Sequence, residues 1–423
     1  MENERKDIKY YAQRNIKVEN LIHFVNKERL IEQHIKQQRN KASGIDKITK
    51  DKYAYKLDEN IDNLIERMKK FSYKPLPVRR TYIPKANGKL RPLGIPAYED
   101  KLVQGVMADV LNEIYECKFL ECSYGFRPNK NCHQAIREIN QRIMINRVNY
   151  ILDCDIKGFF DNVDHKWLMK FLEHDISDKV FLRYINRFLI SGYMEDMKYY
   201  ETDKGTPQGG LISPILANVY LHYVLDLFFE NYVKSKLKGE AYLVRYADDF
   251  LIMFQYESEA KQVYELLIKR LAKFGLEMEQ DKTRILPFGR FKGTKEAFDF
   301  LGFMHYNGIT RTGKYIVGHK ISKKKRKLKH KSITKWIKEH RAYRFIETIN
   351  LLNKKLIGLY AYYGINGMLG ELYKIYYHTL YALRSSIFRR SQRCLSGKTF
   401  DKILRRVPIA EPKIYKDIWC WNI

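Results

Sequence analysis

The fold is decided by the stretch Leu243-Val-Arg-Tyr-Ala-Asp-Asp-Phe-Leu-Ile-Met253. Two short apolar runs flank the pair Asp248-Asp249, which predicts two β-strands joined by a tight turn with two carboxylates at its tip. We expect no basic partner for this pair from the neighbouring sequence. Adjacent negative charges are unfavourable unless a cation neutralises them, and carboxylate oxygens favour a hard divalent ion such as Mg²⁺. Taken alone, however, Asp-Asp is also a common turn sequence.

A second acidic segment strengthens the prediction of a metal site. Tyr150-Ile-Leu-Asp-Cys-Asp-Ile156 is expected to be a strand in which Ile151, Asp153 and Asp155 share one face. A carboxylate from this strand, facing the Asp248-Asp249 turn, would complete a two-metal site. Such sites hold two ions about 3.5–4 Å apart, and the ions clamp the attacking and leaving oxygens in phosphoryl transfer.

The rest of the chain predicts an α+β fold. Residues 1–70 are expected to be mostly helical, with Ile61, Leu64 and Met68 on one face of a helix. Asn87-Gly88 lies between two β-prone runs and predicts a basic hairpin over residues 79–95.

Two further helices are expected beyond this hairpin. Ser213-Pro214 predicts a helix start, with Ser213 as N-cap and Pro214 at the first helical position. A second helix is predicted over residues 263–274, with Val263, Leu266 and Leu271 on its apolar face and Gly275 at its C-cap.

Charge indicates the class of partner. The 423 residues carry 78 Lys+Arg against 49 Asp+Glu, a formal charge of +29, and 14% of the residues are aromatic. This combination favours a polyanion, and nucleic acid in particular. The segment 320–338 is so rich in lysine that we expect it to contact phosphates rather than to form only a solvated linker. No apolar run approaches the length of a membrane span, and the charged first residues are unlike a secretory signal.

Several motifs, in order, resemble those of reverse transcriptases of the group II intron-encoded type. The segments that carry the resemblance are Ile83–Pro96, Ser123-Tyr-Gly-Phe-Arg-Pro128, Asp155-Ile-Lys-Gly-Phe-Phe-Asp161, Gly205-Thr-Pro-Gln-Gly-Gly210, Tyr246-Ala-Asp-Asp249, Asp281-Lys-Thr283, Phe300-Leu-Gly-Phe303 and Leu356–Tyr363. The resemblance covers about residues 40–415. It implies a right-hand polymerase with fingers, a palm that carries an antiparallel sheet, and a helical thumb. The domains expected are an N-terminal extension (1–70), fingers (71–149), palm (150–305), basic linker and thumb (306–390) and a C-terminal tail (391–423).

The resemblance also implies site roles. Asp155, Asp248 and Asp249 match the catalytic, metal-binding carboxylates, and Asp155 is favoured over Asp153 because an aromatic residue, Phe160, follows five positions later. For Asp153 and Asp161 we expect structural roles. Phe160 matches a steric gate against the ribose 2′-OH. The other dNTP-binding residues implied are Lys85, Arg91, Gln208 and Lys282, and the template- or primer-binding residues implied are Arg79, Gly209, Gly210, Leu301 and Gly302.

The function implied is RNA-directed DNA polymerisation, with two Mg²⁺ ions and Mn²⁺ as an alternative, joined to binding of group II intron RNA in splicing and retrohoming. Expected partners are that intron RNA, an RNA template, a DNA primer or target, and dNTPs. We expect a bacterial, cytoplasmic protein that associates with nucleic acid and not with a membrane. The chain ends at Ile423 without the Cys pairs of an endonuclease, so it resembles the short, endonuclease-lacking (group IIC-like) class.

Two other readings stay open. A domesticated reverse transcriptase in repair or phage defence would keep the chemistry and change the task. A non-catalytic RNA-binding splicing factor would be expected to lose the carboxylates or the gate, whereas all four residues are present.

Overall fold

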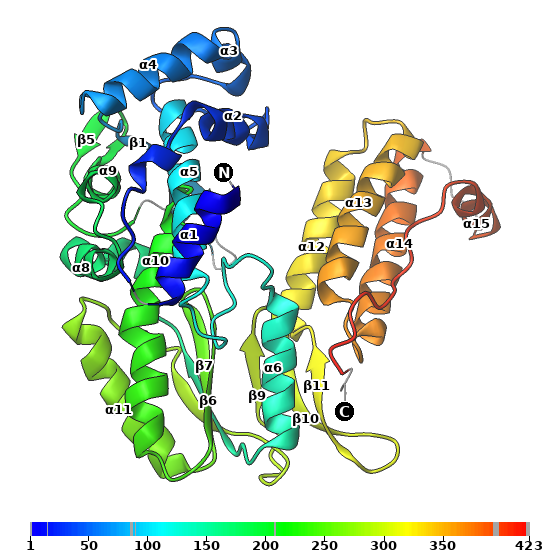
Figure 1. Cartoon of the computed structure of the whole chain (residues 1–423). Helices are drawn as coiled ribbons and strands as arrows, with labels where there is room; N and C mark the ends of the chain where they lie inside the picture. The colour runs from blue at the N-terminus through cyan, green and yellow to red at the C-terminus, as the bar shows by residue number, and fades with distance from the viewer. Residues whose placement is uncertain are drawn as a thin grey trace. The chain divides into compact units, whose positions relative to one another are not determined.

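The structure is a computed structural model that describes residues 2–14, 16–84, 88, 90–206, 209–391 and 397–419. The chain divides into two compact units, and each is described by itself. Unit 1 comprises Met1–Asn131 and Leu152–Ile285, and unit 2 comprises Cys132–Ile151 and Leu286–Ile423. The α+β class predicted from the sequence is confirmed (Figure 1).

Unit 1 begins with helices, as predicted. They are α1 (Glu2–Gln13), α2 (Lys27–Lys36), α3 (Lys50–Ala54), α4 (Leu57–Lys69) and α5 (Tyr98–Tyr115). On α4 the predicted face buries Ile61, Leu64 and Met68. These side chains are apolar at helical spacing, so one stripe of the helix is removed from water.

The predicted basic hairpin forms strands β1 (Val78–Pro84) and β2 (Leu90–Ile95), paired antiparallel. Its turn, residues 85–87 and 89, lies outside the described residues. The sheet has the order β2-β1-β4-β5, in which β4 (Tyr193–Glu195) lies parallel to β1 and β5 (Lys198–Tyr200) pairs with β4.

A second sheet has the order β6-β7-β3-β8. Its strands are β6 (Ala241–Tyr246), β7 (Asp249–Phe254), β3 (Tyr150–Cys154) and β8 (Arg284–Pro287). The hairpin predicted from residues 243–254 is therefore confirmed. Every residue from Phe250 to Phe254 has 0% exposure, so β7 is covered on both faces.

The remaining helices of unit 1 are α7 (Phe159–Asn162), α8 (His165–Asp175), α9 (Lys179–Leu189), α10 (Ser213–Leu221) and α11 (Glu257–Lys273), with π-helical turns at His222–Asp226 and Phe228–Val233. Two details of the sequence prediction were wrong. The N-cap of α10 is Ile212, without a side-chain hydrogen bond, and Ser213 is already helical. Leu266, assigned to the buried face of α11, is 39% exposed because α11 buries only the stripe through Val263, Leu267 and Leu271.

Unit 2 combines a small sheet with helices. The sheet has the order β11-β10-β9, made of β9 (Ala297–Phe300), β10 (Phe303–Ile309) and β11 (Tyr315–Lys320). The helices are α6 (Cys132–Ile145), α12 (Lys323–Glu339), α13 (Phe345–Tyr363), α14 (Leu369–Ser391) and α15 (Gly397–Arg406). In Figure 1, α12, α13 and α14 lie side by side. Their core includes Leu352, Leu356 and Tyr360 of α13 together with Leu372 and Ile375 of α14.

None of the described helices has the length and apolarity needed to span a membrane. The four described cysteines, Cys117, Cys122, Cys132 and Cys154, are all free thiols.

One buried carboxyl in unit 1 predicts a pH dependence of stability. Asp100 is 2% exposed and accepts hydrogen bonds from Tyr73 Oη (2.5 Å) and the Leu76 amide (3.0 Å). Burial raises the pKa of Asp100 to about 7. Between about pH 4 and pH 7 the folded protein keeps a proton on Asp100 that the unfolded chain has released. The stability that comes from binding this proton is lost as the pH rises through 7.

We expect the free energy of unfolding to fall by about 1.4 kcal/mol between pH 6 and pH 8 from this one group. Asp100→Asn should remove that part of the slope. The matched control is Asp109→Asn on the same helix, where Asp109 forms an exposed ion pair with Lys36. Denaturant unfolding at both pH values measures the slope, and equal slopes for wild type and Asp100→Asn would contradict the assignment.

Candidate active site

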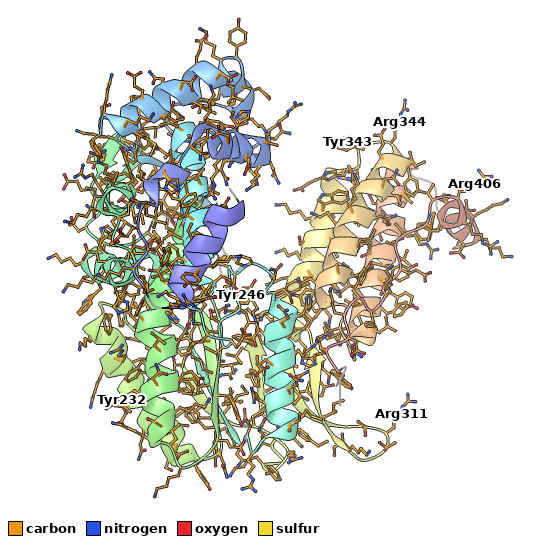
Figure 2. All side chains as sticks on the ribbon, in the orientation of Figure 1. Tyr232, Tyr246, Arg311, Tyr343, Arg344 and Arg406 are labelled. Atoms are coloured by element: carbon orange, nitrogen blue, oxygen red, sulfur yellow. The ribbon has the colours of Figure 1, made fainter. Side chains whose placement is uncertain are left out.

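The turn between β6 and β7 carries the two adjacent aspartates. Tyr246 pairs with Asp249, so Ala247 and Asp248 form a two-residue turn, and Ala247 has a positive φ of 59°. Asp248 is half-buried, and Asp249 is the exposed first residue of β7. Figure 2 labels Tyr246, which marks the position of the turn.

A buried arginine holds this turn from behind. Arg245 is 0% exposed, and its Nε and Nη2 donate to the two carboxylate oxygens of Asp226 at 2.7 and 2.5 Å. Its Nη1 donates to Asn218 Oδ1 (3.0 Å) and to the Ala247 carbonyl (3.1 Å). The sequence predicted no basic partner nearby for the two aspartates, and Arg245, the nearest basic residue in sequence, pairs with Asp226 instead. Arg245 is adjacent, but its charge is matched by Asp226 at the back of the turn.

The segment Ser123–Pro128 packs against the same turn. The Arg245 amide donates to the Cys122 carbonyl, and the Tyr124 amide donates to the Arg245 carbonyl, both at 2.8 Å. A Cβ on Gly125 would lie 2.3 Å from the Ala247 nitrogen, so only glycine fits there. The sequence marked this segment as a motif but did not show that it supports the aspartate turn.

Asp155 lies directly after β3. Its side chain forms an ion pair with Lys282, and its carbonyl accepts a hydrogen bond from the Glu279 amide at 2.8 Å. Asp153, two residues earlier, lies 3.6 Å from Arg284. That contact agrees with the structural role expected for Asp153.

The acidic side chains influence one another. Burial raises the pKa of Asp248, and the charge of Asp155 raises it further, while Arg91 and Arg245 partly oppose this. Desolvation, followed by the charges of Asp248, Asp155 and Asp153, raises the pKa of Asp249 to about 6. Asp249 is exposed, so we give more weight to the neighbouring carboxylates than to desolvation as the cause of its raised pKa. A bound cation would relieve this repulsion.

The donor set suits a divalent cation, although the carboxylates do not converge on one point. Among the described residues, no three His, Cys, Asp or Glu side chains are grouped closely enough to hold a metal ion. Mg²⁺ is typically bound by one or two carboxylates together with substrate phosphates, so a preformed protein cage is not required. Asp155, Asp248 and Asp249 supply hard oxygen ligands of this kind.

Phe160 belongs to a cavity beside the hairpin β1-β2. It is half-buried in α7, and its carbonyl accepts a hydrogen bond from the Thr206 amide at 2.7 Å. The cavity measures about 890 Å³, and its lining includes Pro92, Gly94, Phe160 and Thr206. Gly209, with φ of 118°, approaches this hairpin so closely that a Cβ would lie 2.5 Å from the Gly94 carbonyl. Gly209 therefore lies close to the backbone of another segment of the protein, and its contact with template or primer stays a prediction.

The other residues predicted to bind dNTP, template or primer differ in their surroundings. Arg91 is exposed on β2, and its charge lowers the pKa of Asp248, so it lies within electrostatic reach of that carboxylate. Arg79 donates two hydrogen bonds to the Ser43 carbonyl, at 3.0 and 2.8 Å. Lys85 and Gln208 lie outside the described residues. Gly210 accepts a hydrogen bond from the Ser213 amide at the start of α10.

Leu301 and Gly302 belong to unit 2. They form the tight turn between β9 and β10, with φ values of 47° and 84°. Tyr362 Oη donates to the Leu301 carbonyl at 2.7 Å, which ties this turn to α13.

A family model described as reverse transcriptase (RNA-dependent DNA polymerase) matches residues 83–305, more than half of the chain. The chain belongs to the reverse transcriptase family. This reverse transcriptase is 30% identical to the group II intron-encoded protein LtrA of Lactococcus lactis subsp. cremoris, over 80% of this chain and 69% of LtrA. It is also 30% identical to protein YkfC of Escherichia coli K12, over 67% of this chain and 80% of YkfC.

A third relative is the putative COX1/OXI3 intron 1 protein of Saccharomyces cerevisiae, 32% identical over 55% of this chain and 33% of its own length. Telomerase from Candida albicans, solved with a fragment of telomeric RNA, shows a TM-score of 0.44 and 15% identity over 84% of this chain and 71% of its own, a likeness too weak to support a conclusion.

The expectations of a right-hand polymerase fold and of an RNA-directed DNA polymerase of the group II intron-encoded type are confirmed. As a reverse transcriptase, the protein depends on divalent cations and acts on nucleic acid.

The Arg245–Asp226 pair predicts a specific pattern of stability and activity. Arg245→Met should cost about 3–5 kcal/mol of unfolding free energy, because it leaves a buried carboxylate unpaired. The double variant Arg245→Met/Asp226→Leu should recover most of that loss, since it removes both charges. Primer extension by the double variant should stay low, because the Ala247 carbonyl has still lost its donor.

Denaturant unfolding and primer extension, measured on both variants, test this prediction. A double variant with full activity would show that Arg245 does not position the turn.

Proposed function

We propose that Asp155, Asp248 and Asp249 form the catalytic centre of a two-metal nucleotidyl transferase that joins dNTPs to a primer 3′-OH. The observation that carries this proposal is the placement of Asp248 and Asp249 where β7 begins and of Asp155 directly after β3, its neighbour in the sheet. They would hold two Mg²⁺ ions, with Mn²⁺ as an alternative. When bound, the cations lower the pKa of the attacking hydroxyl and stabilise charge on the phosphates.

Basic side chains would then bind and orient the nucleotide. Arg91, together with Lys85, would hold the incoming triphosphate, since Arg91 is exposed on β2 and acts electrostatically on Asp248. Lys282 balances the charge of Asp155 in the structure, and a competing cation would release it toward the triphosphate or the leaving pyrophosphate.

The remaining assignments concern template and primer. Gln208 would lie against the templating base pair, with Gly209 and Gly210 shaping the backbone beside it. Leu301 and Gly302 would support the primer from their tight turn. Arg79 would contact template backbone only after releasing Ser43.

We propose fingers at 71–149, palm at 150–305 and thumb at 306–390, between an N-terminal extension (1–70) and a C-terminal tail (391–423). The similarity to LtrA supports binding of a group II intron RNA, with help in its splicing and retrohoming. Domesticated use in repair or phage defence is the alternative, and a group II ribozyme encoded around the gene would decide against it.

Primer extension on an RNA template with dNTPs and Mg²⁺ tests the proposed chemistry. Asp248→Asn should slow extension on the order of 10³-fold or more, because a catalytic cation supplies several kcal/mol to the transition state. The matched control is Asp161→Asn, which removes an exposed carboxylate of α7 in the same unit. Equal extension by wild type and Asp248→Asn would reject the assignment.

The gate proposed for Phe160 has its own test. Phe160→Ala should reduce discrimination between dNTP and rNTP by about tenfold to a hundredfold, because the ring no longer fills the space of the 2′-OH. Its neighbour Phe159 is 2% exposed and serves as control. Phe159→Leu should lower stability and leave the ratio of kcat/KM for the two nucleotides unchanged. An unchanged ratio in Phe160→Ala would assign Phe160 to the core.

A further inference from the structure

A small cavity lies in the seam between α12 and α14, which pack against each other within unit 2 (Figure 1). The contacts advance together along both helices, from Arg326–Glu371 (2.6 Å) to Thr334–His378 (3.0 Å), so the two helices run in the same direction. The cavity lies at the later end of the seam and measures about 280 Å³. That volume is close to the lower limit of ligand pockets, about 300 Å³, and suits part of one nucleotide.

The lining of the cavity is cationic and hydroxylic. It includes Lys338 from the last turn of α12, Arg341 from the segment after this helix, and Tyr381, Ser385 and Ser386 from α14. No carboxylate is among its described lining residues. Within the part of the chain that the structure describes, neither Lys338 nor Arg341 forms an ion pair. The earlier end of the seam differs, because Glu371 there pairs with both Arg326 and Lys374. At the cavity end, Glu339 of α12 pairs with Lys335 at 3.7 Å rather than with Lys338, and Arg341 Nε donates to the Lys338 carbonyl at 3.1 Å.

Exposed aromatic rings lie beside this charge. Tyr381 is 72% exposed, and Tyr377, one turn earlier on α14, is 63% exposed and stacks on Tyr373 with ring centroids 5.8 Å apart. A tyrosine this exposed contributes little to the core, but its ring face is available to a base. His378 closes the cavity toward the seam, where its Nε2 lies 3.0 Å from the Thr334 hydroxyl and its ring stacks on His330.

We propose that this cavity binds one nucleotide of single-stranded RNA. Lys338 and Arg341 would contact the phosphate, Ser385 and Ser386 would offer hydroxyls to the phosphate or ribose, and the base would stack on Tyr381. Stacking and phosphate contacts of this kind bind single strands without requiring a particular sequence. The site deepens the proposed function and rests on it, because it supplies a contact for unpaired RNA in unit 2, whereas the carboxylates belong to unit 1.

Fluorescence anisotropy with a labelled, unstructured RNA oligonucleotide and the full chain tests this site. Lys338→Gln/Arg341→Gln should weaken binding about fivefold or more and should reduce the salt dependence, by about 0.7 in the slope of log K against log salt for each lost phosphate contact. The matched control is Lys402→Gln/Arg406→Gln on α15, which removes the same charge. Figure 2 shows Arg406 on α15, apart from the α12–α14 seam.

Tyr381 separates nucleic acid from other polyanions. Tyr381→Ala should weaken RNA binding about fivefold or more, and Tyr381→Phe should keep it, because stacking needs the ring and not the hydroxyl. A loss of affinity in the Lys402/Arg406 control equal to that in Lys338/Arg341 would overturn the site, since only net charge would then matter. Competition by a polyglutamate peptide as effective as by RNA would overturn the choice of ligand.

Primer extension distinguishes this inference from the proposed polymerase. If the wild type fails to extend the primer, and RNA affinity falls in the cavity variants but not in the α15 control, the polymerase is rejected and the RNA site is kept. A wild type that extends, with cavity variants of unchanged RNA affinity, would reject the RNA site alone.

Discussion

The buried ion pair between Arg245 and Asp226 is the interaction on which the aspartate turn depends. Both side chains are 0% exposed, so neither charge is stabilised by water, and each needs the other. Arg245 uses its remaining donors on Asn218 and on the carbonyl of Ala247, a residue with positive φ. One side chain therefore joins the π-helical turn at residues 222–226, helix α10 and the strand that ends at the carboxylates.

Charge is distributed in opposite senses in the two units. In unit 1 the charges of Asp155 and Asp248 raise the pKa of Asp249, and Lys282, which forms an ion pair with Asp155, opposes this only in part. In unit 2 helix α12 is rich in lysine, and its ion pairs join Lys325 to Asp299, Arg326 to Glu371 and Lys335 to Glu339. Carboxylates in unit 1 that can bind cations and basic residues in unit 2 that can bind phosphates together suit a nucleic acid, which carries phosphates and their counterions.

Sequence reasoning found the features that depend on local pattern. The hairpin around Asp248, the hairpin β1-β2 and the buried face of α4 follow from periodicity and turn residues within short windows, and the family followed from the order of the motifs. The sequence did not reveal that Arg245 pairs with Asp226 or that Gly125 lies against Ala247, because such contacts join residues far apart in the chain. It also did not predict that α6 belongs with the C-terminal helices, since its amphipathic pattern shows that one face is buried but not against what.

The position of α6 has a consequence for how the chain folds during synthesis. Its residue Ile136 is 0% exposed in a core formed with β10 and helices α12 to α14, all of which are made after the sheet of unit 1 is complete. While the ribosome adds residues 152–285, Ile136 of α6 lacks its partners in this core. The core of unit 2 can therefore close only after the residues of unit 1 have been synthesised.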